Sequence, residues 1–179
     1  KGTIDGNPDD LLFRIGALCN DSRLASKKKN QWYVIGDPTE GCLLTSARKA
    51  GLDEERLAKK YPRLDEIGFD SQRKMMTTFH KVGKKDVSYT KGAPDIILAH
   101  FSRIRTGGKV RKLTAKDKKA ILAQNQSFSE QALRVLAFAY NDAKSKSSAE
   151  KNMVFVGLQA MIDPPREEVK QSIAKCNDA

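Results

Sequence analysis

Three short segments, far apart in the sequence, carry the residue types that hold a flat polar base with an anionic tail. They are residues 36–41 (Gly-Asp-Pro-Thr-Glu-Gly), 69–76 (Phe-Asp-Ser-Gln-Arg-Lys-Met-Met) and 91–95 (Lys-Gly-Ala-Pro-Asp). Together they offer one aromatic face for stacking on a base, one glutamate, and two lysines whose ammonium groups pair with phosphate. This combination indicates binding of an adenine nucleotide without a P-loop, rather than cleavage of a phosphate bond.

Each of these residues also has an ordinary structural explanation. Phe69, at the edge of an expected strand, either stacks on adenine or packs in the core. Glu40 either accepts a hydrogen bond from an exocyclic amino group or supplies favourable negative charge in the first turn of a helix. Lys91 before Gly92 either marks a close approach of ligand to backbone or an exposed strand-to-helix turn. Spacing alone leaves both interpretations open.

Lys74, one of the two lysines in these segments, and Arg134 are candidate phosphate partners, although Arg134 could equally form a surface salt bridge. The glycine pair before Lys109 lacks the strand-loop-helix setting of a P-loop and is expected to be a hairpin turn. No protease or esterase motif is present. His80 and His100 lack a matching cluster of ligands, and no CxxC pair exists. We therefore expect no catalytic residue and no metal site.

The composition describes a globular chain with an excess of positive charge. The 179 residues are 39% hydrophobic and 31% charged, and their net charge is +11. The basic residues are scattered and are not interleaved with aromatic residues, so we expect no nucleic-acid partner. A basic nucleic-acid-binding domain remains the rival interpretation.

Cysteine usage indicates a reducing compartment rather than a disulfide framework. Cys19 and Cys42 lie in apolar helical settings and are expected to be buried thiols, whereas Cys176 is expected to be exposed. No apolar run approaches the roughly 20 residues that a membrane span needs.

Hydrophobic periodicity and turn residues predict an irregular mixture of helices and hairpins. Residues 144–152 are expected to form a mobile loop. Because regular βαβ units are missing, we predict an α+β fold, a single domain with a mainly antiparallel sheet flanked by helices. The expected helices cover 11–18, 38–51, 53–61, 94–98, 114–133 and 167–176, and the expected strands 31–35, 67–69, 75–81, 86–91, 102–106, 109–113, 135–140 and 153–160.

Six segments, in order along the chain, resemble the nucleotide-binding domain of P-type cation-transporting ATPases, most closely the calcium-pump branch. Residues 91–95 are similar to the family's Lys-Gly-Ala-Pro-Glu motif, with Asp95 in place of Glu. Residues 36–41 and 69–76 resemble its Gly-Asp-x-Thr-Glu and Phe-x-x-x-Arg-Lys-x-Met motifs. The other matching segments are 18–21 (Leu-Cys-Asn-Asp), 133–137 (Leu-Arg-Val-Leu-Ala) and 163–166 (Asp-Pro-Pro-Arg), the last of which resembles a hinge.

The resemblance implies a binding site and a role for each of its members. The adenine-stacking phenylalanine falls on Phe69, the adenine-contacting glutamate on Glu40, and the pocket-floor lysine on Lys91. The chain departs from the family at Ser71, where calcium pumps often carry an arginine. We expect Phe69→Ala and Lys91→Ala to abolish nucleotide binding while the fold persists. The implied site is Glu40, Phe69, Lys74, Lys91, Gly92 and Arg134.

The resemblance also implies a larger protein around this chain. The family's phosphorylated aspartate, in Asp-Lys-Thr-Gly-Thr, its magnesium-binding acids and its membrane helices do not occur in this sequence. We therefore expect residues 1–162 to be the nucleotide-binding domain and 163–179 the hinge and start of the phosphorylation domain.

The expected substrate is Mg-ATP, with magnesium ligands outside this chain. The expected partners are the phosphorylation and actuator domains of the same polypeptide, and the expected setting is the cytoplasmic side of an integral membrane protein. An isolated fragment of this kind should not hydrolyse ATP. A stand-alone nucleotide-binding regulatory module is the alternative.

Overall fold

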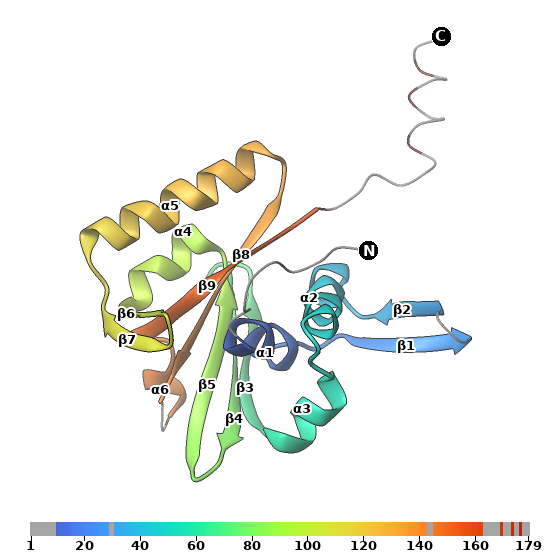
Figure 1. The fold of residues 1–179 in the computed structure, drawn as a ribbon, viewed down its shortest axis with the longest axis horizontal. Coiled ribbons are helices and arrows are strands. Elements are labelled where there is room, and N and C mark those ends of the chain that lie inside the picture. Colours follow the sequence, from blue (N-terminus) through green and yellow to red (C-terminus); the bar gives the residue numbers. More distant parts are fainter. Residues whose placement is uncertain are drawn as a thin grey trace.

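The computed structural model describes residues 10–28, 31–142 and 145–162, together with 169, 173 and 176 (Figure 1). In chain order the elements are α1 (Asp10–Leu18), β1 (Arg23–Lys28), β2 (Gln31–Ile35), α2 (Pro38–Lys49), α3 (Glu54–Lys60), β3 (Arg63–Asp70), β4 (Met75–Val82), β5 (Lys85–Gly92), α4 (Pro94–Ile97), the 3-10 helix η1 (Leu98–His100), β6 (Phe101–Thr106), β7 (Lys109–Lys112), α5 (Ala115–Glu130), β8 (Arg134–Asn141), α6 (Lys146–Ala149) and β9 (Met153–Met161).

The strands of the described residues form one large sheet and one hairpin. The large sheet has the order β3-β4-β5-β8-β9-β6-β7, and β1 pairs with β2 alone. Neighbouring strands run antiparallel except for β6 and β9, which are parallel. The predicted α+β fold is confirmed, and the parallel pair makes the sheet mixed. It arises because β9 enters the sheet between β8 and β6, after the chain has crossed over through α5.

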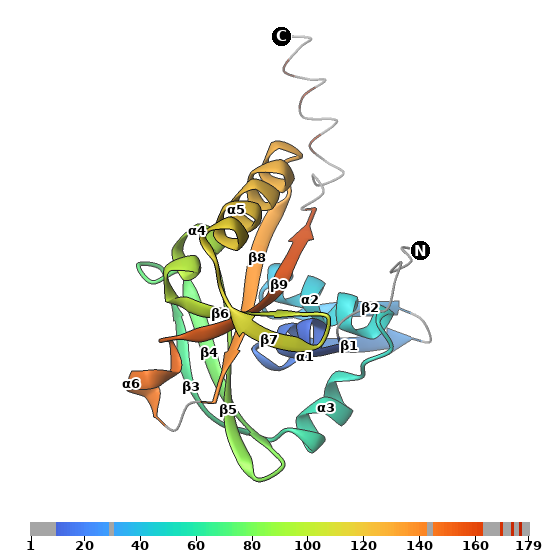
Figure 2. The ribbon, with the colours of Figure 1, turned by 60° about the vertical axis from the view of Figure 1, so that its left-hand side comes forward.

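Helices cover both faces of the large sheet, so the molecule has three layers (Figure 2). Ile15 of α1 and Leu44 of α2 belong to the same buried cluster as Phe138 of β8. On the opposite face, Ile97 of α4 and Ile121 of α5 belong to a second buried cluster. Strand β8 serves both clusters because successive side chains point to opposite faces of a sheet. The two cores therefore share one sheet, as expected of a single domain.

Local sequence signals explain where the two longest helices begin. The Asp37 carboxylate accepts hydrogen bonds from the first turn of α2, and Pro38 occupies a first-turn position. Thr114 and Asp117 form a reciprocal capping box at the start of α5. This helix ends earlier than predicted, because Ala132 has a left-handed φ of 56° and cannot continue it.

The structure corrects three expectations. Strand β1 was not predicted, because its sequence is rich in lysine and it depends on backbone pairing with β2 rather than on a buried face. The segment expected to be an irregular loop contains the short helix α6. Cys42 is exposed, because α2 buries the opposite face that carries Leu43, Leu44 and Ala47.

The prediction for Cys19 is confirmed, whereas the predictions for residues 163–176 fall largely outside the described residues. Cys19 is buried as predicted, burial raises the pKa of its thiol, and its Sγ lies 3.4 Å from Met76 O. The predicted hinge at 163–166 lies outside the described residues, as does most of the helix predicted for 167–176.

Candidate nucleotide-binding site

One end of the large sheet gathers the segments that the sequence singled out. At this end β3 finishes with Asp70, β4 begins with Met75 and β5 finishes with Gly92. Met75 pairs with Asp70 on one side and with Gly92 on the other, and Gly92 pairs with Ala137 of β8. Antiparallel pairing of neighbouring strands therefore brings the segments 69–76, 91–95 and 133–137 together at one end of the sheet.

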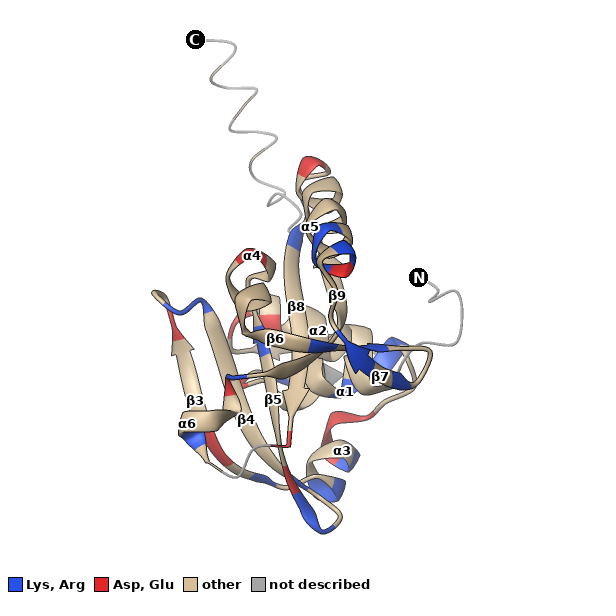
Figure 3. Cartoon of the chain, turned by 90° about the vertical axis from the view of Figure 1, so that its left-hand side faces the viewer, with Lys and Arg blue, Asp and Glu red and all other residues tan. Residues whose placement is uncertain are grey.

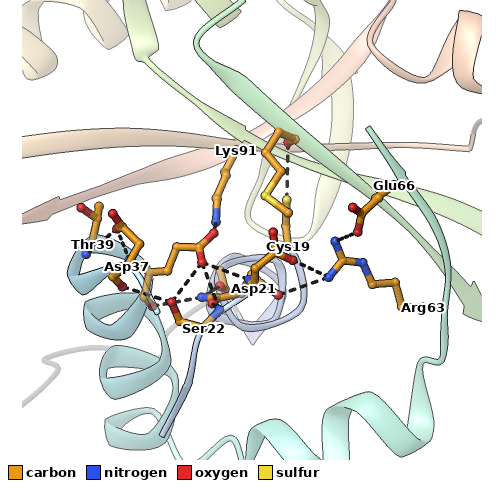
Figure 4. A network of polar contacts seen from close by, with 12 residues as sticks. Cys19, Asp21, Ser22, Asp37, Thr39, Arg63, Glu66 and Lys91 are labelled. Carbon is orange, nitrogen blue, oxygen red and sulfur yellow. Dashed lines mark hydrogen bonds and ion pairs between the residues drawn. The ribbon is translucent and has the colours of Figure 1, made fainter. Parts of the chain in front are cut away.

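Glu40 and Lys91 form an ion pair at this end of the sheet. Figure 4 shows Lys91 pointing toward the loop that follows α1. Lys91 Nζ, from β5, donates to Glu40 Oε1, from the first turn of α2. The side chain of Lys91 is only 8% exposed and that of Glu40 only 14%. A lysine and a carboxylate that are so little exposed satisfy each other's charge. The predicted acid and lysine thus lie on the same side of the molecule and act as one unit.

The second oxygen of Glu40 is held by the loop that follows α1. Glu40 Oε2 accepts hydrogen bonds from Asp21 N and Ser22 N, both at 3.0 Å, and from Ser22 Oγ at 3.1 Å. Each carboxylate oxygen has about two lone-pair sites. Oε2 is therefore fully used, whereas Oε1 receives one protein donor and can accept another from a ligand.

Sequence reasoning did not identify this loop as part of the site. Asn20 Nδ2 donates to Gly16 O and to Glu40 O, both at 3.0 Å, so the loop is fastened to α1 and α2 together. Arg63 of β3 pairs with Asp21 at 2.8 Å and holds it from the other side. Residues 18–21 were matched to a family segment but were given no role in the site. Its hydrogen bonds to Glu40 depend on tertiary contact between α1 and α2.

Phe69 lies on the surface near the end of β3. The residue is 66% exposed, which excludes the alternative that it packs in the core. A large exposed aromatic face is what base stacking requires. Phe69 is therefore available to a ligand without rearrangement of its neighbours.

Lys74 closes the turn between β3 and β4, and Gly92 allows this turn to lie against β5. Lys74 is exposed and has a φ of 49°, and its backbone oxygen accepts a hydrogen bond from Ala93 N at 3.0 Å. A Cβ atom added at Gly92 would lie 2.8 Å from Lys74 O. Only glycine fits here, so Gly92 shapes the site through close backbone approach.

Arg134, at the start of β8, is exposed and reaches the first turn of α2. Its guanidinium donates to Thr39 Oγ1, next to Glu40. Among the residues that the structure describes, Arg134 forms no salt bridge with a carboxylate, in contrast to the alternative interpretation. Thr39 was not predicted as a site residue, although it belongs to the segment 36–41 that the sequence singled out.

Asp37 provides a pH-dependent contribution to the same turn. Burial alone would raise its pKa, but hydrogen bonds from Glu40 N and Thr39 N and the charge of Arg134 hold the pKa below its ordinary value of 3.8. The resulting stabilisation is present above pH 3.8 and disappears as the pH falls through the lower pKa of the folded state.

We therefore expect Asp37→Asn to fold normally at neutral pH, since asparagine is also a good helix cap. Its melting temperature should fall less than that of the wild type as the pH is lowered below 3.8, because the variant has no carboxylate to protonate there. Thermal unfolding followed by circular dichroism across this pH range measures the difference. The same decrease in melting temperature below pH 3.8 for both proteins would contradict the assigned role of Asp37.

Arg73 is not available to the ligand, although it belongs to one of the singled-out segments. Its Nη1 lies 2.7 Å and 2.8 Å from the two carboxylate oxygens of Glu150, and its Nη2 donates to Gly68 O at 2.7 Å. Ser71 is exposed in the same turn. Of the basic residues near this edge, Lys74 and Arg134 are therefore the ones placed to meet an anionic tail.

Most of the excess positive charge lies elsewhere. Residues 101–119 carry eight Lys or Arg and one Asp, and Figure 3 shows the basic positions on β7 and the start of α5. Strand β7 forms the edge of the sheet opposite to β3. The site is thus not the most basic part of the surface, and ligand binding there depends on specific contacts.

The residues that the structure describes contain neither a cluster of metal ligands nor a membrane-spanning helix. No group of three or more His, Cys, Asp or Glu side chains in this part of the chain could hold a metal ion. None of its helices is long and apolar enough to cross a membrane.

Comparison with known proteins identifies the family. Residues 10–168 match the family described as the P-type ATPase cytoplasmic domain N. The chain is 41% identical over 175 residues to a calcium-transporting ATPase of Bacillus subtilis, and the match covers 94% of this chain and 19% of that protein.

Two further relatives point the same way. Calcium-transporting ATPase 1 of Lactococcus lactis is 38% identical over 174 residues, which cover 94% of this chain and 19% of the relative. The cation-transporting ATPase pma1 of Synechocystis is 38% identical over 185 residues, covering 98% and 20%. The chain thus spans about 19% of the length of the first two relatives. The predicted family is confirmed: the chain belongs to the cytoplasmic N domains of P-type ATPases.

Proposed function

We propose that this chain is the ATP-binding domain of a membrane-embedded calcium-transporting ATPase. It holds the adenine and ribose and presents the γ-phosphate to an aspartate in a separate phosphorylation domain. The names of the relatives support calcium as the transported ion. The chain's contribution to catalysis is then positioning of the nucleotide, which is a large part of phosphoryl transfer.

The proposal extends to the rest of the polypeptide. Magnesium arrives with ATP and takes its protein ligands from outside this chain. The phosphorylation and actuator domains are the partners, and we place the boundary between the N domain and the hinge after residue 162.

The observation that carries this proposal is the exposed ring of Phe69 at the sheet end that also holds the Glu40–Lys91 pair. Stacking on Phe69 would contribute about 1–3 kcal/mol to binding. Glu40 Oε1 would accept the exocyclic amino group of adenine while Lys91 keeps that oxygen in place. Gly92 allows the β3–β4 turn, which carries Lys74, to lie against β5 beside the proposed pocket.

An NMR titration of the 179-residue chain with ATP tests the proposal. We expect the amide signals of residues 36–41, 69–76, 91–95 and 134–137 to shift, because these segments form the proposed site. Adenosine should shift the Phe69 and Glu40 signals but leave those of Lys74 and Arg134 largely unchanged, since it has no phosphate.

The basic hairpin of β6 and β7 provides an internal control for this titration. Tripolyphosphate has no base. We expect it to shift the amide signals of this hairpin, because the lysines and arginines of β6 and β7 attract any anion. If ATP also shifted only the signals of this hairpin, the chain would bind anions in general, and the proposed adenine pocket would be refuted.

A further inference from the structure

Glu150, the residue after α6, joins parts of the chain that lie far apart in sequence. Its carboxylate receives Arg73 Nη1 at 2.7 Å and 2.8 Å and Thr77 Oγ1 at 2.9 Å. Its backbone oxygen lies 2.8 Å from His100 Nδ1, at the end of η1. One residue thus links the β3–β4 turn, strand β4 and the segment that follows α4.

The β3–β4 turn is held by hydrogen bonds: Asp70 Oδ1 accepts from Gln72 N at 2.9 Å and from Arg73 N at 2.8 Å inside the turn, and the Arg73 side chain ties the turn to Glu150. Residues 68–72 are all exposed, so apolar burial does not fix the turn. Arg73 extends from the turn to Glu150 and also donates to Gly68 O at 2.7 Å, directly before Phe69. The guanidinium therefore connects Glu150 to the backbone on both sides of the aromatic residue. Charge-assisted bonds of this kind are stronger and more directional than neutral ones.

The other side of Glu150 reaches the interior of the sheet. Thr77 Oγ1 lies 2.8 Å from Thr90 Oγ1, and both threonines are fully buried. Thr90 directly precedes Lys91. A second contact braces α6 itself, because Lys146 lies 2.8 Å from Asp65 of β3, and Figure 2 shows α6 beside this edge of the sheet. Glu150 is therefore attached through Thr77 to buried polar groups of β4 and β5, and through Arg73 to the turn.

We propose that Glu150 is a positioning residue for the nucleotide, which acts through Arg73 to hold the turn bearing Phe69 and Lys74. This proposal rests on the proposed function. Neither Glu150 nor Arg73 touches the ligand. Their ion pair lowers the conformational freedom of the turn before ATP arrives, so less ordering is left for the binding step.

The variants Glu150→Gln and Arg73→Gln test this in the 179-residue chain. Arg73 is 32% exposed, so the unpaired guanidinium of Glu150→Gln can reach water and the variant should fold. We expect each single variant to weaken ATP binding about tenfold, comparable to losing one hydrogen bond to a charged group. The double variant should be no weaker than either single one, because both remove the same interaction.

A readout without nucleotide separates this proposal from the proposed function. Lys74 N donates to Asp70 O at 2.7 Å inside the turn. Its amide hydrogen should exchange about tenfold faster in Glu150→Gln, because the turn opens more often. If the wild-type chain bound no ATP, the proposed function would fail, and this exchange rate would still decide whether Glu150 positions the turn.

The ion pair between Arg48 and Glu54 provides a matched control. Its side chains are 27% and 15% exposed, close to the 32% and 17% of Arg73 and Glu150. Glu54→Gln should leave both ATP affinity and Lys74 exchange unchanged. Equal effects of Glu54→Gln and Glu150→Gln would reveal a general loss of stability and overturn the proposal, as would unchanged Lys74 exchange in Glu150→Gln.

Discussion

A Lys91→Ala variant is expected to lose about 3 kcal/mol of folding free energy, at the lower end of the range for breaking a buried ion pair, and to lose ATP binding. Removal of the ammonium leaves the Glu40 carboxylate poorly exposed to water, with Asp21 N, Ser22 N and Ser22 Oγ as its remaining donors. These three hydrogen bonds keep the loss from being larger. The sequence predicts that the fold of this variant persists, and the burial of Lys91 adds that its stability is reduced.

Urea unfolding of the isolated variant measures the loss, and a double variant supplies the control. Lys91→Met combined with Glu40→Leu removes both charges and should recover part of the stability, because no unpaired charge remains although the three donors to Glu40 Oε2 lose their acceptor. It should still fail to bind ATP, since both polar groups of the site are gone. If Lys91→Ala were as stable as the wild type, the ion pair would be accessible to water and would not organise the site.

A Phe69→Ala variant is expected to bind ATP more weakly by about 1–3 kcal/mol, or roughly 5- to 150-fold, which is the contribution of base stacking. Its free energy of unfolding should barely change, because Phe69 is 66% exposed and fills no core position. Isothermal titration calorimetry and urea unfolding of the same preparations measure the two effects.

Trp32→Ala provides the matched control for this experiment. Trp32 is also a large exposed aromatic residue, 56% exposed, but it lies on the β1–β2 hairpin, which projects away from the main sheet (Figure 1). Its removal should leave ATP affinity unchanged. Equal affinities of wild type and Phe69→Ala for ATP, with the fold intact, would remove stacking from the proposed mechanism.

These two substitutions also separate what residue types reveal from what burial reveals. An aromatic residue at a strand edge and a lysine before glycine are both visible in the sequence, but their exposure is not. Phe69 is exposed and Lys91 is buried, so the first variant is expected to affect binding alone and the second to affect stability as well. The difference follows from how the β3–β4 turn and α2 pack, which depends on contacts between distant segments.

The sequence was sufficient to predict the family, the α+β class and most of the elements, because motifs, helix caps and hydrophobic periodicity are local properties of the chain. Pro38 and Thr114, for example, mark helix starts that the structure retains. It could not reveal β1, which depends on pairing with β2, nor the parallel contact between β6 and β9.

The contacts that hold the site together could not be predicted from the sequence, because they join distant segments. Glu40 is bound by Asp21, Ser22 and Lys91, and Arg73 is bound by Glu150, across separations of 18 to 77 residues. Such partners are chosen by the packing of α1, α2 and α6 around the sheet. Many alternative pairings are compatible with the same sequence pattern, and the free energy of the whole fold selects among them.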